Sequence, residues 1–362
     1  MGTLRSILLA TDFRLSSQGA AEATARLATT FGARVTALHV REEFLTWPVS
    51  PFENQDQLTQ QLVAHKVDLA EFLVHAGPPA DTVVHKAQEL GVDLLVIGTG
   101  EKVRDGQLVV GPIAESILER AASPVLAINP HGPRLAFRSI LCPVDHSRLS
   151  RRALEDGIQL ARALGGRLVV LSVIPDVSWL TAAAETGQLA DAKLEHEAQW
   201  VKEFDEFLKT VSFDGVEWER ELRQGNPHEQ ITAAARERGA DLLVMGATGR
   251  TGLVRVLLGS VTRRVLRQLP CSLLLVKDQT VFEEQVLLDL DVVDRLAAEG
   301  RDKLLGGEPA AAAGKFRQAL ALEPYHTAAL DGLANACEQL GQADAARRYR
   351  NRAERLRRRA GG

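Results

Sequence analysis

The chain has 362 residues, 45% hydrophobic and 25% charged, and a formal net charge of −4 at pH 7. These are ordinary values for globular proteins, and the length predicts two or three domains. No run of about 18 apolar residues occurs, so we expect no membrane span, and the start MGTLRSILLATD lacks the features of a secretory signal. The three cysteines lie far apart, without disulfide-framework or metal-ligand spacing, which favours a reducing cytoplasm.

The first 280 residues consist of two copies of one unit. RSILLATD at 5–12 returns as RSILCPVD at 138–145, and ELGVDLLVIG at 89–98 returns as ERGADLLVMG at 237–246, with further matches in the same order. Chance does not produce several matches in one order, so the repeat predicts two domains of similar fold. The stretch NPHGPRLAF, rich in proline and glycine, marks the joint between them. The predicted domains are residues 1–132, 133–280 and 281–362.

Each copy alternates short apolar runs rich in β-formers with amphipathic helical segments. In the second copy the predicted strands are 139–144, 167–173, 216–223, 241–246 and 272–276, and the predicted helices include 150–164 and 228–239. Continuous apolar strands that alternate with helices indicate an α/β fold, a doubly wound parallel sheet with helices on both faces. Such sheets bind ligands at the carboxyl ends of their strands, where Asp145, Val173 and Gly246 fall.

The stretch GATGRTGLVRVLLGSVTRRVL, residues 246–266, follows the fourth strand of the second copy directly. Gly246 lets the chain turn sharply, Gly249 permits close approach of a ligand to the backbone, and Gly259 with Ser260 begins a helix. Bare amides and the positive end of a helix dipole favour phosphate, so the spacing predicts a polyphosphate site. It is neither a P-loop nor a dinucleotide-binding loop. The alternative is that these glycines only form a loop and a helix cap. Further donors in the stretch are Thr248, Arg250 and Thr262.

Both copies resemble universal stress protein domains. The residues that carry the resemblance are the glycine stretch, the first strand ending at Asp145, and the segments GNPHEQI and PCSLLLVK. The resemblance covers residues 1–280 and implies an adenine-nucleotide alpha-hydrolase-like fold that binds ATP, whose phosphates Mg²⁺ commonly accompanies. It implies that the nucleoside lies against Pro143, Val144, Asp145 and Val173. It implies that the phosphates lie against Met245, Gly246, Thr248, Gly249, Arg250, Gly259, Ser260, Val261 and Thr262.

The first copy departs from this pattern where it matters for an anion. Its loop keeps the two outer glycines, Gly98 and Gly111, but Glu101 replaces the middle glycine and Pro112 replaces the serine. A carboxylate repels a polyphosphate, and proline lacks both the hydroxyl and the backbone N–H. Pro112 is also simply a good first residue for a helix. We therefore expect the first copy to keep its fold and not to bind ATP.

No nucleophile with a supporting base is apparent in the sequence, so we expect neither catalytic residues nor a metal site. His146 is expected at the surface, in a loop at a strand end, and His228 in the first turn of a helix. Asp93 and Asp241 occupy equal places in the two copies, which indicates a structural role.

After Lys277 the strand patterns stop and a second repeat begins, with a period of 34 residues that relates Gly307 to Gly341. The segment resembles two tetratricopeptide repeats, whose small residues let paired helices approach closely. The apolar residues expected to fill the space between the helices are Phe316, Leu320, Leu333 and Leu340. Two repeats are fewer than the roughly three needed for a stable array, so they are expected to lean on a neighbouring helix, the other domains or a second chain. Such repeats typically present a surface to a partner protein.

The sequence therefore predicts an ATP-binding stress-response regulator or adaptor, in which ATP is a ligand that stabilises one conformation and is not a fuel. The resemblance implies edge-to-edge pairing of the two domains through their last strands, as a pseudo-dimer within one chain or as a homodimer. The arginine-rich C-terminal segment favours a solvated helix. A second interpretation is that its arginines contact an acidic partner or nucleic acid, although the sequence contains no nucleic-acid-binding motif. Two other functions stay open: a nucleotide-free scaffold, and a slow ATPase or self-phosphorylating enzyme that uses Ser260 or Thr262.

Overall fold

The structure is a computed structural model, in which the chain divides into two compact units, Met1–Gln279 and Thr280–Gly362. The first unit holds both copies of the repeated sequence, here called the first and second halves. The described part of the second unit is helical. The structure describes residues 4–41, 59–60, 63, 67–104, 107–175, 188–249, 258–277, 293–322 and 326–360.

The first half alternates strands and helices, as its apolar pattern predicts. Its elements are β1 (Ser6–Ala10), α1 (Leu15–Phe31), β2 (Arg34–Arg41), β3 (Leu69–Ala76), α3 (Pro79–Glu89), β4 (Leu94–Gly98), β5 (Val103–Arg104), β6 (Gln107–Leu108), α4 (Pro112–Arg120) and β7 (Val125–Ile128).

The second half contains all five predicted strands, and their ends differ from the predicted ends by no more than two residues. The two predicted helices are also present, and a further long helix, α7, was not predicted. The elements are β8 (Ser139–Val144), α5 (Arg148–Leu164), β9 (Arg167–Pro175), α7 (Gln188–Leu208), β10 (Glu217–Gly225), α8 (Pro227–Glu237), β11 (Leu242–Gly246), α9 (Ser260–Leu266) and β12 (Ser272–Val276).

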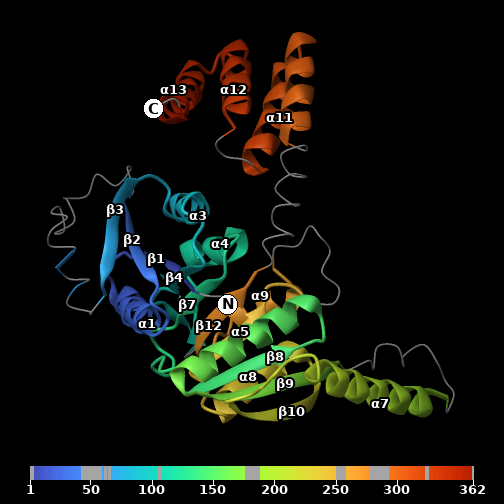
Figure 1. Ribbon diagram of the computed structural model, residues 1–362. Helices are drawn as coiled ribbons and strands as arrows, with labels where there is room; N and C mark the ends of the chain where they lie inside the picture. Colours follow the sequence, from blue (N-terminus) through green and yellow to red (C-terminus); the bar gives the residue numbers. More distant parts are fainter. Residues whose placement is uncertain are drawn as a thin grey trace. The chain divides into compact units, whose positions relative to one another are not determined.

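Ten of the described strands form one sheet, in the order β10-β9-β8-β11-β12-β7-β4-β1-β2-β3 (Figure 1). Within each half, neighbouring strands of this sheet are parallel, and β5 and β6 form a separate antiparallel pair. In the second half the strand order reverses between β8 and β11, so the loops after these two strands diverge at the carboxyl edge. This is the switch point at which sheets of this kind bind ligands.

The two halves join through β12 and β7, which pair antiparallel with Leu273 opposite Ala127 and Leu275 opposite Val125. Of the two pairings left open by the sequence, the chain thus forms the one within itself. Because the junction is antiparallel, the strands of the two halves run in opposite directions. The carboxyl ends of the two strand sets therefore lie at opposite edges of the shared sheet.

Helices cover both faces of the sheet, which confirms the doubly wound arrangement (Figure 1). On one face α1, α5 and α7 bury side chains such as Leu27, Leu154 and Phe204. On the other face α3, α4, α8 and α9 bury side chains such as Leu118 and Ile231. Central strands such as β8 and β11 contribute side chains alternately to the two clusters, which is why their sequences are apolar almost throughout.

The two equivalent aspartates hold the starts of the strands. Asp93 Oδ2 accepts hydrogen bonds from the backbone N–H groups of Arg5 and Ser6, at 2.8 and 2.9 Å. Asp241 Oδ2 accepts one from the N–H of Arg138 at 2.9 Å. Burial raises the pKa of Asp241, and the backbone N–H groups that it accepts from oppose that rise. The structural role predicted for both residues is confirmed.

The second unit contains a helix over residues 293–305, followed by α11 (Pro309–Leu322), α12 (Thr327–Gln339) and α13 (Ala343–Ala360). Phe316 of α11 is fully buried, and its ring lies against the backbone of two glycines on neighbouring helices. A Cβ atom on Gly300 would lie 2.7 Å from this ring, and one on Gly332 would lie 2.3 Å from it. Glycine at both places is therefore required for the helices to approach this closely.

Of the four apolar residues expected between these helices, Phe316 and Leu333 are buried and Leu320 is half-buried. Leu340 is 37% exposed, so its predicted core position was wrong. It is the C-cap of α12, where the chain leaves the helix and turns through Gly341 at a φ of 74°. No helix in the described parts of the chain has the length and apolar character needed to cross a bilayer.

Candidate functional site

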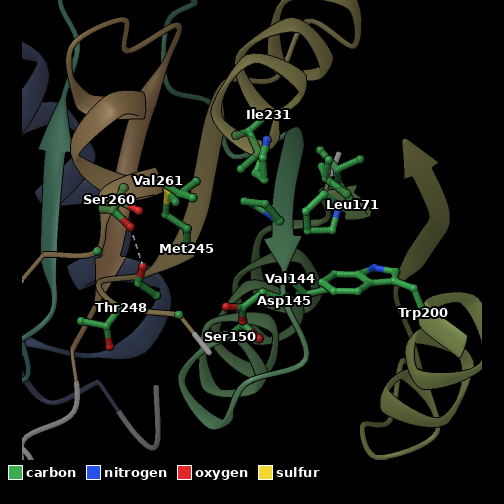
Figure 2. A pocket seen from close by; sticks show the side chains of 18 residues that line it. Val144, Asp145, Ser150, Leu171, Trp200, Ile231, Met245, Thr248, Ser260 and Val261 are labelled. Atoms are coloured by element: carbon green, nitrogen blue, oxygen red, sulfur yellow. Dashed lines mark hydrogen bonds between the residues drawn. The ribbon is translucent and has the colours of Figure 1, made fainter. Parts of the chain in front are cut away.

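A pocket of about 500 Å³ lies at the carboxyl ends of β8, β9 and β11, at the switch point of the second half (Figure 2). Small-molecule sites typically occupy about 300–1,000 Å³. Twelve of the thirteen residues predicted for the nucleotide line this pocket, and the thirteenth, Arg250, lies outside the described residues. The lining residues are Pro143, Val144, Asp145, Ser150, Leu171, Val173, Pro175, Trp200, Pro227, Ile231, Met245, Gly246, Thr248, Gly249, Gly259, Ser260, Val261 and Thr262.

The glycine loop closes back on the strand that it leaves. The N–H of Ala247 donates to the carbonyl of Val276 in β12 at 2.9 Å, and the N–H of Gly259 donates to the carbonyl of Ala247 at 2.7 Å. Thr262 Oγ1 donates to the carbonyl of Gly246 at 3.2 Å. These bonds hold the two ends of the loop together, so the start of α9 stays beside the end of β11.

Gly249 of the loop is required by a close contact, because a Cβ atom there would lie 2.3 Å from Asp145 Oδ2. A Cβ atom on Gly259 would lie 3.4 Å from the Cα of Thr248, which is ordinary van der Waals contact. Gly259 is the N-cap of α9, and Ser260 is the first residue of the helix. Because both glycines line the pocket, a ligand meets bare backbone at these positions.

Asp145, directly after β8, is held by the start of α5. The N–H and the hydroxyl of Ser147 donate to its Oδ1 at 3.1 and 2.6 Å, and Ser147 Oγ in turn accepts from the N–H of Ser150 at 3.2 Å. The other carboxylate oxygen faces Gly249. The pocket therefore contains one oriented hydrogen-bond acceptor beside the glycine loop.

The pocket has two ends of different chemistry. Around the loop, the backbone and the hydroxyls of Thr248 and Ser260 offer hydrogen-bond donors, which suit an anion, whereas the hydroxyl of Thr262 already donates to the Gly246 carbonyl. The opposite end is apolar and is built from side chains of β9 and α8. Figure 2 shows Leu171 and Ile231 at this end, away from Ser260. The arrangement suits a ligand with a negative tail and a flat apolar head.

Helix α7 supplies a residue at the apolar end that sequence reasoning missed. Trp200 lines the pocket, and its indole Nε1–H donates to Ser172 Oγ at 3.0 Å. The apolar spacing of Trp200, Phe204 and Phe207 is typical of an amphipathic helix and was a usable signal for α7.

His146 is buried, contrary to the surface position predicted for it. Its side chain is 4% exposed, and the ring centroids of Trp200, Phe204 and Phe207 lie 5.0, 5.6 and 5.5 Å from its own. Its Nε2 lies 3.1 Å from Ser172 Oγ. The prediction failed because it did not include α7, which packs over this loop.

Other missed lining residues also had signals in the sequence. Leu171 lies two places before Val173 on β9, and alternate residues of a strand face the same side. Ile231 follows Pro227 by four places on α8, which brings both to one face of that helix.

The predicted position of His228, in the first turn of a helix, is confirmed. Its Nδ1 is buried and has no hydrogen-bond partner among the described residues. Its carbonyl accepts from Thr232 Oγ1 at 3.0 Å. His228 does not line the pocket.

The first half keeps the loop scaffold but fills it differently. The N–H of Gly111 donates to the carbonyl of Thr99 at 2.8 Å, the counterpart of the bond that closes the second loop. Glu101 Oε1 accepts from the N–H of Ser16, near the start of α1, at 3.3 Å. Pro112 is the first residue of α4. The carboxylate of Glu101 therefore accepts a hydrogen bond from a backbone N–H group beside the loop.

Comparison with known families gives two matches of one family model, described as the universal stress protein family, at residues 3–129 and 136–277. These ranges correspond to the two halves of the sheet.

Several curated relatives match parts of the chain. A universal stress protein of Methanocaldococcus jannaschii is 35% identical over 147 residues, which cover 39% of this chain and 82% of the relative. One from Synechocystis is 31% identical over 153 residues, or 40% of this chain and 99% of the relative. The universal stress protein E homolog of Haemophilus influenzae is 26% identical over 220 residues, which cover 59% of this chain and 71% of the relative.

Solved structures resemble a larger part of the chain. A universal stress protein from Archaeoglobus fulgidus covers 76% of this chain and 99% of its own, with a TM-score of 0.54 and 19% identity. A functionally unknown protein from Pseudomonas aeruginosa covers 78% of this chain and 95% of its own, with a TM-score of 0.59 and 19% identity. At these identities the likeness shows the fold.

Proposed function

Because the chain belongs to the universal stress protein family, as a tandem of two such domains, we propose that its second half binds ATP and thereby regulates a stress response. The nucleoside lies against Pro143, Val144, Asp145 and Val173 in this proposal. The phosphates lie against Met245, Gly246, Thr248, Gly249, Arg250, Gly259, Ser260, Val261 and Thr262.

One observation carries the proposal: residues from β8, β9, β11 and α9, far apart in the sequence, converge on a single pocket. The phosphate motif and the family resemblance point to the same residues. A loop and a helix cap alone would not need a cavity of ligand size between the loop and the strand ends.

The residues present fit a nucleotide. The bare backbone at Gly249 and Gly259 and the hydroxyls of Thr248 and Ser260 suit a polyphosphate, with Mg²⁺ as its usual counter-ion. The carboxylate of Asp145, which lines the pocket beside Gly249, suits a hydroxyl or amine donor. The apolar end suits a base.

ATP acts in this proposal as a ligand that favours one conformation of the domain. When bound, it supplies a compact negative charge that draws the glycine loop and the start of α9 together. The two ends of the loop share hydrogen bonds with β11 and β12, which connect the loop to the sheet.

The helical second unit is proposed to be a pair of tetratricopeptide-like repeats that contacts a partner protein. Gly307 and Gly341, 34 residues apart, both have positive φ, at 77° and 74°, and both follow a helix end. The tight contacts of Phe316 with Gly300 and Gly332 support the close helix packing that such repeats need.

The test is the nucleotide content of the full chain. Native mass spectrometry of the purified protein, and calorimetry with added ATP and Mg²⁺, should give one ATP per chain. Two ATP per chain would contradict the assignment of the first half as unable to bind. The absence of ATP binding would favour a nucleotide-free scaffold, and phosphate release that disappears in Ser260→Ala would favour an ATPase.

A further inference from the structure

Trp200 forms part of the pocket wall although it belongs to none of the strands and loops that carry the proposed phosphate contacts. It comes from α7 and is 8% exposed. Figure 2 shows its indole extending from the helix toward Val144, below Leu171. A large planar ring therefore lies at the apolar end of a pocket whose other end consists of bare backbone and hydroxyls.

The indole is fixed in place from behind. Its Nε1–H donates to Ser172 Oγ at 3.0 Å, and the same oxygen lies 3.1 Å from His146 Nε2. Ser172 is fully buried, and the centroids of the His146 and Trp200 rings are 5.0 Å apart. A buried ring whose polar atom already has a partner offers the pocket only its apolar surface.

Helix α7 itself is anchored on the same histidine. Phe204, one turn beyond Trp200, is fully buried, and its ring stacks on His146 with an interplanar angle of 14°. Phe207 lies against His146 from a further position on the helix. The wall is thus part of the packed core of the second half.

We propose that Trp200 is the base-recognising residue of the site, on which the purine ring of the nucleotide stacks, so that the pocket selects a nucleoside triphosphate over a bare polyphosphate. This inference rests on the proposed ATP binding. Every base presents a flat π-face, and stacking on an aromatic side chain is the usual way in which proteins hold one without reading its edges. Leu171 and Ile231 cover the remaining apolar surface.

The experiment compares ATP with inorganic tripolyphosphate, each with Mg²⁺, by calorimetry on the full chain. The wild type should bind ATP more tightly than tripolyphosphate. Trp200→Ala should weaken ATP binding about tenfold or more, which corresponds to the usual contribution of one stacked base, and should leave tripolyphosphate binding unchanged. Trp200→Phe keeps an aromatic ring and should fall between the two.

Trp218 provides a matched control. It lies on β10 outside the pocket, is 36% exposed, and stacks on Phe213 with ring centroids 3.8 Å apart. Trp218→Phe should bind both ligands as the wild type does. ATP should also quench part of the tryptophan emission of the wild type and of Trp218→Phe, and Trp200→Phe should lose that quenching.

The outcomes separate this inference from the proposed function. If the wild type binds ATP and Trp200→Ala binds it equally well, Trp200 does not recognise the base, although the site still binds ATP. Equal affinity of the wild type for ATP and tripolyphosphate would overturn the inference in the same way. If the wild type binds no ATP, the proposed function fails, and this inference fails with it. Should Trp200→Ala not fold, the affinity and quenching of Trp200→Phe against Trp218→Phe decide the question.

Discussion

Asn129 and Lys277 follow the last strands of their respective halves, and each donates a side-chain hydrogen bond to a backbone carbonyl of the other half. Asn129 Nδ2 donates to Leu269 O and Lys277 Nζ to Glu119 O, both at 3.0 Å. The two contacts thus repeat across the antiparallel junction of β7 and β12. They differ because the amine of Lys277 can titrate and the amide of Asn129 cannot. Burial lowers the pKa of Lys277 to about 7, and the nearby Glu119 carboxylate opposes this shift.

The first prediction concerns pH. An unfolded lysine titrates at about 10.4, so between about pH 7 and pH 10.4 the unfolded chain binds more protons than the folded one. The free energy of unfolding then rises with pH over this window, and below it the burial of a charged Lys277 weakens folding by a constant amount. Lys277→Met keeps the length and removes the charge. The stability of the wild type relative to this variant should increase from pH 7 to pH 10, on the order of 3 kcal/mol.

Denaturant unfolding of both proteins at several pH values measures this difference, and other titrating groups cancel in the comparison. Parallel curves for the two proteins would show that Lys277 is not a buried ammonium of low pKa.

The second prediction separates size from charge at the glycine loop. Any side chain at position 249 displaces the Asp145 carboxylate, because a Cβ atom there would lie 2.3 Å from Oδ2. Gly249→Gln should therefore weaken ATP binding by roughly tenfold, and Gly249→Glu, of the same size, should weaken it by roughly a further tenfold through repulsion of the phosphates. Calorimetry on both variants makes the comparison. Wild-type affinity in Gly249→Glu would mean that the loop does not hold the phosphates.

The third prediction transfers a feature of the first half to the second. Ser260→Pro copies Pro112 and removes a backbone N–H and a hydroxyl at the first residue of α9, where proline is well tolerated by the helix. Ser260→Ala removes the hydroxyl alone. Loss of a hydrogen bond to a charged group should lower ATP affinity about tenfold or more in the proline variant, and less in the alanine variant. If the two variants bind equally, the amide of Ser260 makes no phosphate contact.

The fourth prediction concerns the helical unit and uses two glycines as a pair. Gly332→Ala places a methyl group 2.3 Å from the ring of Phe316, and overpacking of this kind costs about 1–3 kcal/mol. A Cβ atom on Gly314 of α11 would have nothing within 4 Å, so Gly314→Ala should instead stabilise the helix by about 0.5–1 kcal/mol.

Hydrogen exchange of the amides of α11 and α12, in the full chain, reports both changes. Faster exchange is expected for Gly332→Ala and slower exchange for Gly314→Ala. Slower exchange in both variants would indicate that helix propensity outweighs the contact with Phe316.

The sequence was sufficient for the features that depend on local pattern. Strands such as 139–144 and 272–276 were predicted at their observed bounds, because a buried parallel strand is apolar throughout and ends abruptly at polar residues. The lining residues on the glycine loop could be predicted because their spacing is a local motif that the family resemblance assigns to phosphate; the contact of Gly249 with Asp145 appears only in the structure.

The features that depend on tertiary packing could not be predicted in the same way. His146 has the local setting of an exposed loop residue, and its burial follows from α7, a helix some fifty residues further along the chain. The pairing of β7 with β12 within one chain has the same strand pattern as pairing between two chains. Leu340 fits the apolar period of its helix, but it falls at the point where the helix ends.

The antiparallel junction has a consequence for assembly. Strands β7 and β12 satisfy each other's backbone groups, so the edges left at the two ends of the sheet belong to β3 and β10. Because the two halves belong to one chain, the half with the proposed ATP site is always paired with the half without it, in a fixed one-to-one ratio. Two separate chains would reach the same pairing only by exchanging subunits.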